Sequence, residues 1–299
     1  MKVNKRTISE IAIASIISDS LLEEVYTTPK PGLVDKADNG AHKDMDISTF
    51  ERSTKAIAPY IAKMYTAGKS SVSALQLVFQ DIRRIGLVAE KAMFEATGGV
   101  NTHKGAIFTL GILSASLGYS VSHTNGDFNI LDILPIAKEM TFDAIEEDFA
   151  QMSSRQPVTH GEILYKKYHE RGIRGQAQEG FPIIRDVAYP YYQYLIKYSV
   201  EPNIRNVMTL LFIIANLKDT NVIARSSPEI LSALQTDAMK ILDSTFLFTP
   251  YDIEKVSALN QKCISLNISP GGAADILAAT LFLHHVEDFI ASKQQAQQP

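Results

Sequence analysis

The chain has 299 residues, 45% of them hydrophobic, and its 33 acidic and 29 basic side chains leave a formal net charge of -4. This length and composition can bury a large core, which excludes an intrinsically disordered protein. The nearly balanced charge gives no broad positive field for a polyanion, so we expect no nucleic-acid partner. Cys263 is the only cysteine, which excludes an intrachain disulfide and a thiolate metal site and favours a reducing, cytoplasmic location.

The amino-terminal segment is basic over 1–6, but the sequence after it is interrupted by Ser15, Ser18 and Ser20 and has no small-residue cleavage site. We therefore expect it to be part of the fold and not a signal peptide. The most hydrophobic stretches, 207–217 and 276–283, are shorter than the roughly 20 apolar residues that span a bilayer. The sequence predicts no membrane segment.

Hydrophobic residues recur every three or four positions along nearly the whole chain, which is the helical period, and convincing alternation with a period of two is absent. In chain order we expect helices over 8–26, from about 48, and over 75–96, 104–118, 130–149, 161–170, 183–199, 203–218, 228–243, 251–265 and 272–291. The predicted fold class is all-α, a single globular bundle of about ten or more helices. With no long linker and no fixed-period repeat, we predict one catalytic domain over 1–292 and a frayed tail over 293–299.

Local signals predict where several of these helices begin. Three pairs match the capping box, in which side chains satisfy the free amides of a first helical turn. These pairs are Thr7 with Glu10, Ser48 with Glu51, and Ser73 with Gln76. A Ser-Pro-Glu sequence over 227–229 supplies a cap, a proline in the first turn and an acid near the positive end of the helix dipole.

Candidate functional residues gather in segments at or near helix ends that are dense in Gly, Asp, His, Lys and Arg. In the first segment, over 28–46, prolines stiffen the loop and Asp44 and Asp46 lie close to His42. Two or three such oxygen ligands, together with phosphate oxygens, are what Mg²⁺ normally accepts. The pattern suggests a metal-triphosphate site, although Asp46 could instead cap the next helix while Asp44 is solvated.

The second segment, over 90–105, contains the end of one helix, a Gly-rich turn and the start of another helix. The turn carries Asn101, His103 and Lys104, and the free amides of a helix start attract phosphate. The spacing does not match a P-loop or a dinucleotide-binding glycine motif. The alternatives are that Glu90 pairs with a neighbouring basic side chain and that His103 is a capping residue.

The third segment, over 171–182, offers Arg171 and Arg174 separated by glycines. Guanidinium groups are suited to bidentate phosphate contacts. Solvated arginines beside a helix C-cap glycine would look the same, but the density of charge and glycine favours a functional role.

Two further segments lie in the carboxyl-terminal part of the chain. Residues 218–225 follow an apolar helix and contain Asp219. Residues 269–275 form a Gly-rich helix start with Asp275 one turn in. Asp275 could be a ligand or only a partner of the helix dipole.

Taken together, six motifs resemble one known family. They are TPKPGLVD, NGAHKDMD, AEKAMFEATGGVNTHKGAIF, RGIRGQAQEGFP, KDTNV and SPGGAADILAATLF, in this order and spread from residue 28 to 283. They closely resemble the triphosphoribosyl-dephospho-CoA synthase family, and the resemblance covers essentially the whole chain. One departure is that Arg225 is followed by Ser226 and Ser227 where the family has Gly-Gly, so the backbone beside Arg225 is expected to differ.

The resemblance implies an all-α fold and a reaction of ATP with 3′-dephospho-CoA that yields 2′-(5″-triphosphoribosyl)-3′-dephospho-CoA and free adenine. It implies that this product becomes the prosthetic group on the acyl carrier subunit of citrate lyase or malonate decarboxylase. The next partner is then an acyl-carrier-protein-modifying transferase.

For that reaction, the site must hold a triphosphate, deprotonate a hydroxyl, assist the departure of adenine and stabilise positive charge at the sugar. The candidates for acid and base are Asp35, His42 and Glu90, and the sequence does not decide which does which. The candidates for substrate binding are Lys30, Asn101, His103, Lys104, Arg171, Arg174 and Asp275, with phosphate charge assigned to Lys30, Lys104 and Arg174. The candidates for binding Mg²⁺ are Asp44, Asp46 and Asp219.

Two other classes of function stay open. A metal-dependent N-glycosidic hydrolase acting on a nucleotide or an ADP-ribose-like substrate would use water as the nucleophile and need no dephospho-CoA pocket. A helical binding or interaction protein would show no turnover. Ionisable residues concentrated in glycine loops argue against an interaction protein, because interaction surfaces more often present apolar and aromatic anchors.

Overall fold

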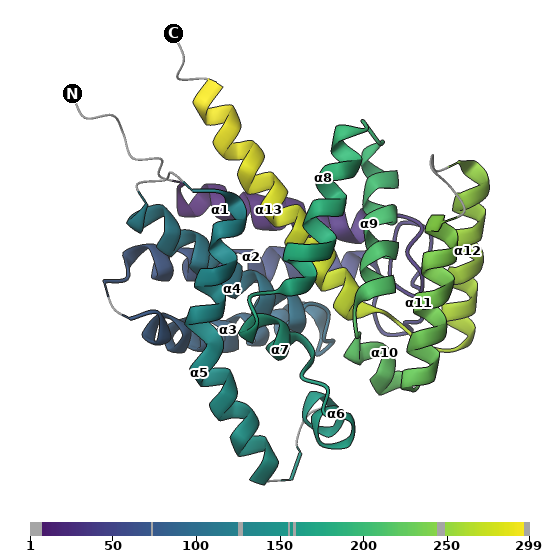
Figure 1. Cartoon of the computed structure of the whole chain (residues 1–299), viewed down its shortest axis with the longest axis horizontal. Helices are drawn as coiled ribbons and strands as arrows, with labels where there is room; N and C mark the ends of the chain where they lie inside the picture. The colour runs from purple at the N-terminus through teal and green to yellow at the C-terminus, as the bar shows by residue number, and fades with distance from the viewer. Residues whose placement is uncertain are drawn as a thin grey trace.

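The computed structural model describes residues 8–72, 74–124, 128–154, 156–157, 160–243 and 249–295. These residues form helices and no strand, which confirms the predicted all-α class (Figure 1). The α-helices are α1 (Glu10–Tyr26), α2 (Ile47–Ser70), α3 (Leu75–Thr97), α4 (Lys104–His123), α5 (Ile133–Ser154), α6 (His160–Tyr168), α7 (Gly172–Gln178), α8 (Tyr189–Lys197), α9 (Pro202–Asn216), α10 (Thr220–Arg225), α11 (Pro228–Asp243), α12 (Pro250–Ser265) and α13 (Gly271–Gln295). A 3-10 turn, η1 (Ile130–Asp132), precedes α5, and a π-helical turn, η2 (Ile183–Ala188), precedes α8.

Helix α4 lies at the centre of the amino-terminal half of the protein. Helices α2, α3, α5 and α13 all pack against it. It is long and apolar enough to cross a membrane, and 78% of its most hydrophobic 18-residue window is buried inside the protein. Its sequence is apolar around most of its circumference, as expected for a helix that neighbouring helices surround.

The close approach of α2 and α4 depends on glycine. A Cβ added to Gly68 in α2 would lie 2.0 Å from the carbonyl oxygen of Ala115, and a Cβ added to Gly118 in α4 would lie 2.0 Å from the carbonyl oxygen of Tyr65. Contacts that short are not tolerated between close-packed helices. The two glycines therefore set the distance between α2 and α4.

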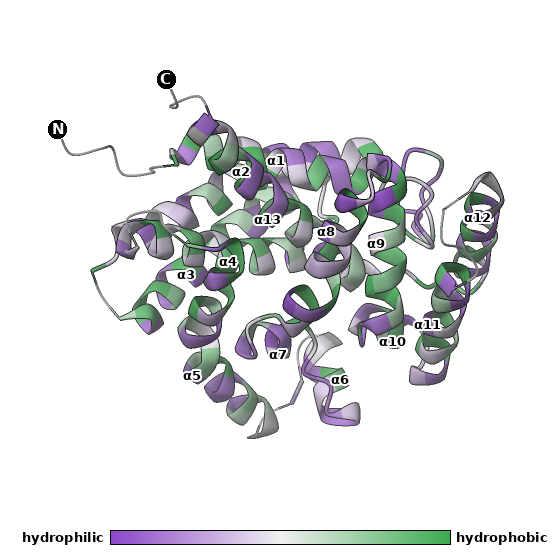
Figure 2. Ribbon diagram, turned by 45° about the horizontal axis from the view of Figure 1, so that its top comes forward, coloured by the Kyte–Doolittle hydropathy of each residue, from purple (hydrophilic) through white to green (hydrophobic). Residues whose placement is uncertain are grey.

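Helix α13 connects the two halves of the protein. It packs against α1 and α4 on one side and against α9 on the other, and α9 in turn packs against α8 and α11. Hydrophobic residues are concentrated along α4 and α9 in Figure 2, as expected for the helices that other helices surround.

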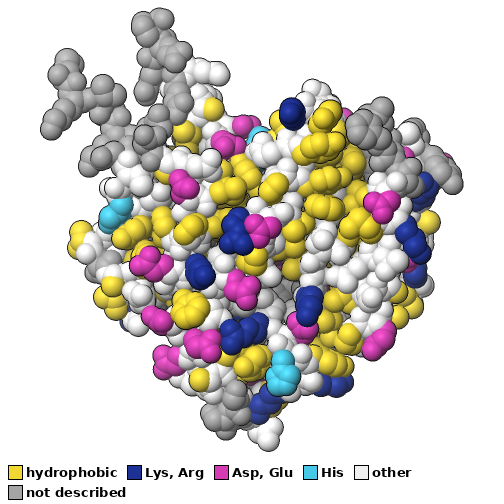
Figure 3. Space-filling model, in the orientation of Figure 1, with side chains coloured by type: hydrophobic (Ala, Val, Ile, Leu, Met, Phe, Trp, Pro, Cys, Tyr) yellow, Lys and Arg dark blue, Asp and Glu magenta, His cyan; other side chains and the backbone are white. Residues whose placement is uncertain are grey.

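The face of the protein shown in Figure 3 mixes both signs of charge. Lys and Arg side chains are interspersed with Asp and Glu around its middle, and hydrophobic side chains gather over α8. In α8 and just after it, Tyr194 and Tyr198 are 44% and 55% exposed. This face thus carries no single-sign field of the kind that steers a polyanion.

All three predicted capping boxes differ from the structure, and that of Ser48 is replaced by Asp46 with Thr49. Thr7 and Ser73 lie outside the described residues. The N-cap of α1 is Ser9, whose hydroxyl oxygen accepts a hydrogen bond from the amide of Ala12 at 3.1 Å. The N-cap of α3 is Ala74, which has no side-chain hydrogen bond to offer. Neither of these helices uses the predicted capping box.

Short helices and irregular turns are the other differences. Helices α7 and α10 were not predicted, because seven and six residues are too few to show a helical period. The segment expected as one helix over 183–199 is divided into η2 and α8. Helix α13 continues to Gln295, three residues past the predicted domain boundary, while 296–299 lie outside the described residues.

We predict that Gly118→Ala destabilises the protein by about 1–3 kcal/mol, because the added methyl group must push α2 away from α4. Gly86→Ala in α3 is the matched control. Its Cβ would meet only the terminal methyl of Met64 at 3.7 Å, so the better helix propensity of alanine should stabilise by about 0.5–1 kcal/mol. Urea unfolding of both variants measures the difference, and equal effects would contradict the role given to Gly118.

Candidate active site

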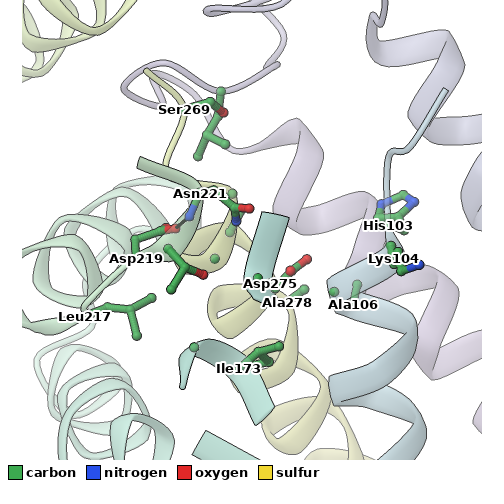
Figure 4. A pocket seen from close by; sticks show the side chains of 18 of the residues that line it. His103, Lys104, Ala106, Ile173, Leu217, Asp219, Asn221, Ser269, Asp275 and Ala278 are labelled. Carbon is green, nitrogen blue, oxygen red and sulfur yellow. Dashed lines mark hydrogen bonds between the residues drawn. The ribbon is translucent and has the colours of Figure 1, made fainter. Parts of the chain in front are cut away.

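A cavity of about 870 Å³ lies where the amino ends of α4, α7, α10 and α13 come together. Its wall is rich in ionisable side chains of both signs. These are Glu24, Lys30, His42, His103, Lys104, Glu170, Arg171, Arg174, Glu179, Lys218, Asp219, Arg225 and Asp275. Figure 4 shows Asp275 between the start of α4, with His103 and Lys104, and the α10 side, with Asp219 and Asn221.

Asp219 ties α10 to α13. It is the N-cap of α10, and one carboxylate oxygen accepts the amide of Asn221 at 2.8 Å. The other oxygen accepts the amide of Ala273, in the first turn of α13, at 2.9 Å. A Cβ at Gly272 would lie 2.9 Å from this carboxylate, so glycine is needed for the contact. Burial raises the pKa of Asp219, and the backbone amides oppose that rise.

Asp275, one turn into α13, reaches the start of α4. The residue at the N-cap of α4, His103, makes no side-chain cap, and the amide of Ala106 instead interacts with Asp275. A Cβ at Gly105 would lie 2.0 Å from a carboxylate oxygen of Asp275, so this approach also requires glycine. Burial raises the pKa of Asp275 well above its usual value, and the nearby carboxylates of Glu24 and Asp219 raise it further.

Glu24 and Lys30 form a buried ion pair on the α1 side of the cavity. The ammonium group of Lys30 lies 2.5 Å from the Glu24 carboxylate and donates to the Glu24 carbonyl oxygen at 2.9 Å. Both side chains are less than a tenth exposed. Burial raises the pKa of Glu24 although Lys30 opposes the rise. The positive charge predicted to bind phosphate at Lys30 is thus largely compensated within the protein.

Asp35 organises the loop after α1 instead of facing the cavity. One carboxylate oxygen accepts the amide of Lys30 at 2.8 Å and the hydroxyl of Thr28 at 3.1 Å. The other accepts the amides of Ala37 and Asp38 at 2.6 and 3.1 Å. Asp35 does not line the cavity, so the structure gives no support to its predicted role as acid or base.

His42 lines the cavity with both ring nitrogens engaged. Nε2 lies 2.9 Å from the hydroxyl of Ser269, and Nδ1 lies 3.5 Å from a guanidinium nitrogen of Arg225. Burial and the positive charge of Arg225 lower the pKa of His42 to about 4, against the opposing effect of Asp44. His42 is therefore neutral near pH 7 and carries no extra proton that it could donate as an acid.

The three predicted Mg²⁺ ligands are not brought together. Asp44 is 64% exposed in its side chain, 3.9 Å from Nδ1 of His42, and Asp219 is committed to two helix ends. Asp46 is the N-cap of α2, where it accepts the amide of Thr49 at 2.8 Å in place of the predicted cap at Ser48. No group of three His, Cys, Asp or Glu side chains in the described ranges is arranged to hold a metal ion.

The turn before α4 places its polar residues as a unit. Lys104 forms an ion pair with Glu90 at 2.9 Å, and the oxygen of the Asn101 side chain accepts the Lys104 amide at 3.2 Å. Lys104 and Asn101 line the cavity, whereas Glu90 does not. The alternative in which Glu90 pairs with a basic neighbour is therefore the one that the structure favours.

Arg171, just before α7, and Arg174, within α7, differ in their partners. Arg171 contacts Gln178 at 2.5 Å and Glu146 at 3.2 Å, and it lies over the ring of Phe149. The hydrogen bond recorded for the guanidinium group of Arg174 goes to the sulfur of Met152, at 3.6 Å, and no ion pair holds it within the described part of the chain. Arg174 is thus a cavity-lining cation available to an anionic ligand.

The sequence matches the model of a known protein family. The profile of the family described as ATP:dephospho-CoA triphosphoribosyl transferase matches residues 10–294. The chain belongs to this family. A protein of Escherichia fergusonii named 2-(5''-triphosphoribosyl)-3'-dephosphocoenzyme-A synthase is 36% identical over 274 residues, which are 91% of this chain and 90% of that protein.

Two further relatives extend the comparison. The protein CitXG of Leuconostoc mesenteroides subsp. cremoris is 38% identical over 288 residues, 95% of this chain, and the chain spans 60% of the length of that relative. A relative from Citrobacter koseri is 36% identical over 279 residues, 92% of this chain and 90% of its own. The family membership expected from the six motifs is confirmed.

In this member of the transferase family, most of the predicted site residues converge on the cavity. Those that line it are Lys30, His42, Asn101, His103, Lys104, Arg171, Arg174, Asp219 and Asp275. Those outside the lining are Asp35, Asp44, Asp46 and Glu90. Sequence reasoning missed Glu24, although a glutamate beside Val25 in a largely apolar helix is a signal that it is buried and paired.

We predict that Asp275→Asn becomes more stable relative to the unchanged protein as pH rises from about 4 to 8. The raised pKa of the folded carboxyl means that ionisation of Asp275 favours unfolding once pH passes the unfolded value of about 3.9, and asparagine removes this dependence. Urea unfolding without ligand at pH 4.5, 6 and 7.5 measures the difference.

Asp186→Asn is the control for this titration. Arg185 lowers the pKa of Asp186 through hydrogen bonding and charge, so the stabilising effect of this carboxylate is nearly complete above the unfolded value of about 3.9. Asp186→Asn should therefore differ from the unchanged protein by a nearly constant amount from about pH 4.5 to 7.5. Parallel curves for Asp275→Asn and the unchanged protein would contradict the raised pKa.

Proposed function

We propose that the chain transfers the 5-triphosphoribosyl group of ATP to a ribose hydroxyl of 3′-dephospho-CoA and releases adenine. The observation that carries the proposal is the match of the family described as ATP:dephospho-CoA triphosphoribosyl transferase to residues 10–294. It is supported by the cavity of about 870 Å³, which is lined by residues from all six motifs.

The reaction exchanges one bond at the anomeric carbon of ATP. The dephospho-CoA hydroxyl oxygen bonds to that carbon and loses its proton, while the bond to adenine breaks and adenine gains a proton. A buried carboxyl with a raised pKa holds its proton to a higher pH and is suited to supply this proton, and burial raises the pKa of Asp275 well above its usual value. Glu24, buried close enough to raise the pKa of Asp275, is the nearby candidate to accept the proton of the hydroxyl.

The cationic side chains of the cavity suit the two polyanionic substrates. Arg174 has no carboxylate partner in the described ranges, and Lys104 is half exposed beside Glu90. Arg225 donates to the Ala41 carbonyl oxygen and lies 3.5 Å from Nδ1 of His42. Phosphate oxygens are better partners for these groups than water, because both charges then take part in hydrogen bonds. We assign ATP and dephospho-CoA phosphates to them.

For Mg²⁺ we propose that the ion enters with ATP and keeps phosphate and water oxygens as its main ligands. Mg²⁺ commonly retains several waters and needs only one or two protein carboxylates. This fits a protein whose described residues contain no preformed group of three metal ligands. When bound, the ion would neutralise part of the triphosphate charge.

We also propose that the product passes to a transferase that modifies an acyl carrier protein, as the family resemblance implies. A cytoplasmic location suits this role and the single cysteine, Cys263, whose thiol is buried and has a pKa raised to about 12. A thiol in that state is not poised for disulfide exchange.

The expected products distinguish the transferase from its alternatives. With ATP, Mg²⁺ and dephospho-CoA present, adenine should appear together with one triphosphoribosyl-dephospho-CoA per adenine. Chromatography and mass identification, with each substrate omitted in turn, measure both. A hydrolase would release adenine from ATP alone, a kinase would form ADP, and a binding protein would form neither. ADP formation, or adenine release that does not need dephospho-CoA, would contradict the proposed transferase reaction.

We predict that EDTA abolishes adenine release and that added Mg²⁺ restores it. Because Asp44 is exposed and outside the cavity lining, Asp44→Asn should leave the Mg²⁺ concentration for half-maximal rate unchanged. A strong rise in that concentration would return Asp44 to the metal site, and full turnover in EDTA would remove the metal requirement.

A further inference from the structure

His103 presents one ring nitrogen that the protein leaves without a partner. The side chain lines the cavity and is 3% exposed. Nδ1 lies 2.7 Å from the hydroxyl of Ser53 on α2, and the edge of Phe50 contacts the ring with centroids 4.9 Å apart. Nε2 is buried and has no hydrogen-bond partner in the part of the chain that the structure describes. The ring is held in place, with one buried polar atom left for a ligand.

A chain of two hydroxyl groups favours one tautomer of the neutral His103 ring. The hydroxyl of Thr102 donates to the oxygen of Ser53 at 2.7 Å. A serine hydroxyl has one proton, and Ser53 is left to donate its proton to Nδ1 of His103. A neutral imidazole that accepts at Nδ1 carries its own proton on Nε2. The unpartnered atom is therefore an N–H donor.

The surroundings keep this donor neutral. Burial and the positive charge of Lys30 lower the pKa of His103 to about 3. The ring thus stays uncharged across the physiological range, and its Nε2–H donates to a ligand without taking up a proton. A buried donor without an acceptor destabilises the protein, and an acceptor on a bound ligand relieves this cost.

We propose that Ser53 and Thr102 are positioning residues that present the Nε2–H of His103 to a phosphate oxygen of the bound nucleotide. This inference rests on the proposed function and specifies which part of ATP this side of the cavity takes. A phosphate oxygen is the acceptor that fits, because His103 stands at the N-cap of a 20-residue helix and is followed by the cation of Lys104. The positive end of a helix dipole, a lysine and a neutral N–H donor together favour an anion.

The tautomer can be observed directly. In a long-range ¹H–¹⁵N spectrum, the His103 signals, assigned by their loss in His103→Gln, should show a proton on Nε2 and no titration between pH 5 and 8. In Thr102→Val, the Ser53 proton is no longer directed to Nδ1, and a mixture of tautomers is expected. A protonated Nδ1 in the unchanged protein, or a ring that titrates near pH 6.5, would overturn the proposal.

Binding measurements identify the acceptor. Ser53→Ala and Thr102→Val should each weaken the binding of ATP and of inorganic triphosphate by roughly 3- to 10-fold and leave adenosine binding unchanged. Ser116→Ala is the matched control, since it removes a buried hydroxyl of α4 that has no hydrogen-bond partner in the described ranges and does not line the cavity. It should change neither affinity.

Thr102→Val keeps the test usable should Ser53→Ala not fold, because Thr102 is partly exposed and valine has nearly the same shape. Weaker adenosine binding with unchanged triphosphate binding would place the nucleoside, and not phosphate, at His103 and overturn the inference. The spectrum and the binding assays need no catalytic turnover. Their outcome can therefore be distinguished from that of the product analysis, which tests the transferase reaction.

Discussion

The cavity depends on one constraint, which is that helices begin at its wall and the free amides of their first turns must find acceptors. Asp219 satisfies this need for α10 and α13 together, and Asp275 lies against the first turn of α4, where His103 makes no side-chain cap. Gly105 and Gly272 let the carboxylates come close enough. Two carboxyl groups thus hold three helix ends around the same space.

This solution has an electrostatic consequence for the chemistry inside. Asp219 and Asp275 are buried at helix ends, and Glu24 is buried nearby against Lys30. A negative charge on Glu24 or Asp219 disfavours ionisation of Asp275. Deep in the cavity the result is carboxyl groups with raised pKa values, beside an imidazole, His42, whose pKa is lowered to about 4. Cations such as Lys104 and Arg174 stand in the same wall, where a polyanionic nucleotide can reach them.

The sequence predicted the segments of the site better than the roles of their residues. Asp44 and Asp46 form a pattern that suits a metal, yet the carboxylate of Asp46 caps its own helix and that of Asp44 points to solvent. Asp35 lies in a motif of the family and binds four donors of its own loop. Backbone amides donate hydrogen bonds to the carboxylates of Asp35 and Asp46, which are then not available to a metal or a substrate. The spacing of residues in the sequence does not reveal these hydrogen bonds.

Helical periodicity, composition and ordered motifs were sufficient to determine an all-α transferase-family chain and the segments that carry its polar residues, because these properties are local along the sequence. The tertiary structure alone decided that Glu24 faces Lys30 and that Asp275 reaches across to the start of α4. It alone decided that Ser53 of α2 lies 2.7 Å from Nδ1 of His103. Those outcomes depend on distances between helices and on burial, and both arise only when remote segments pack together.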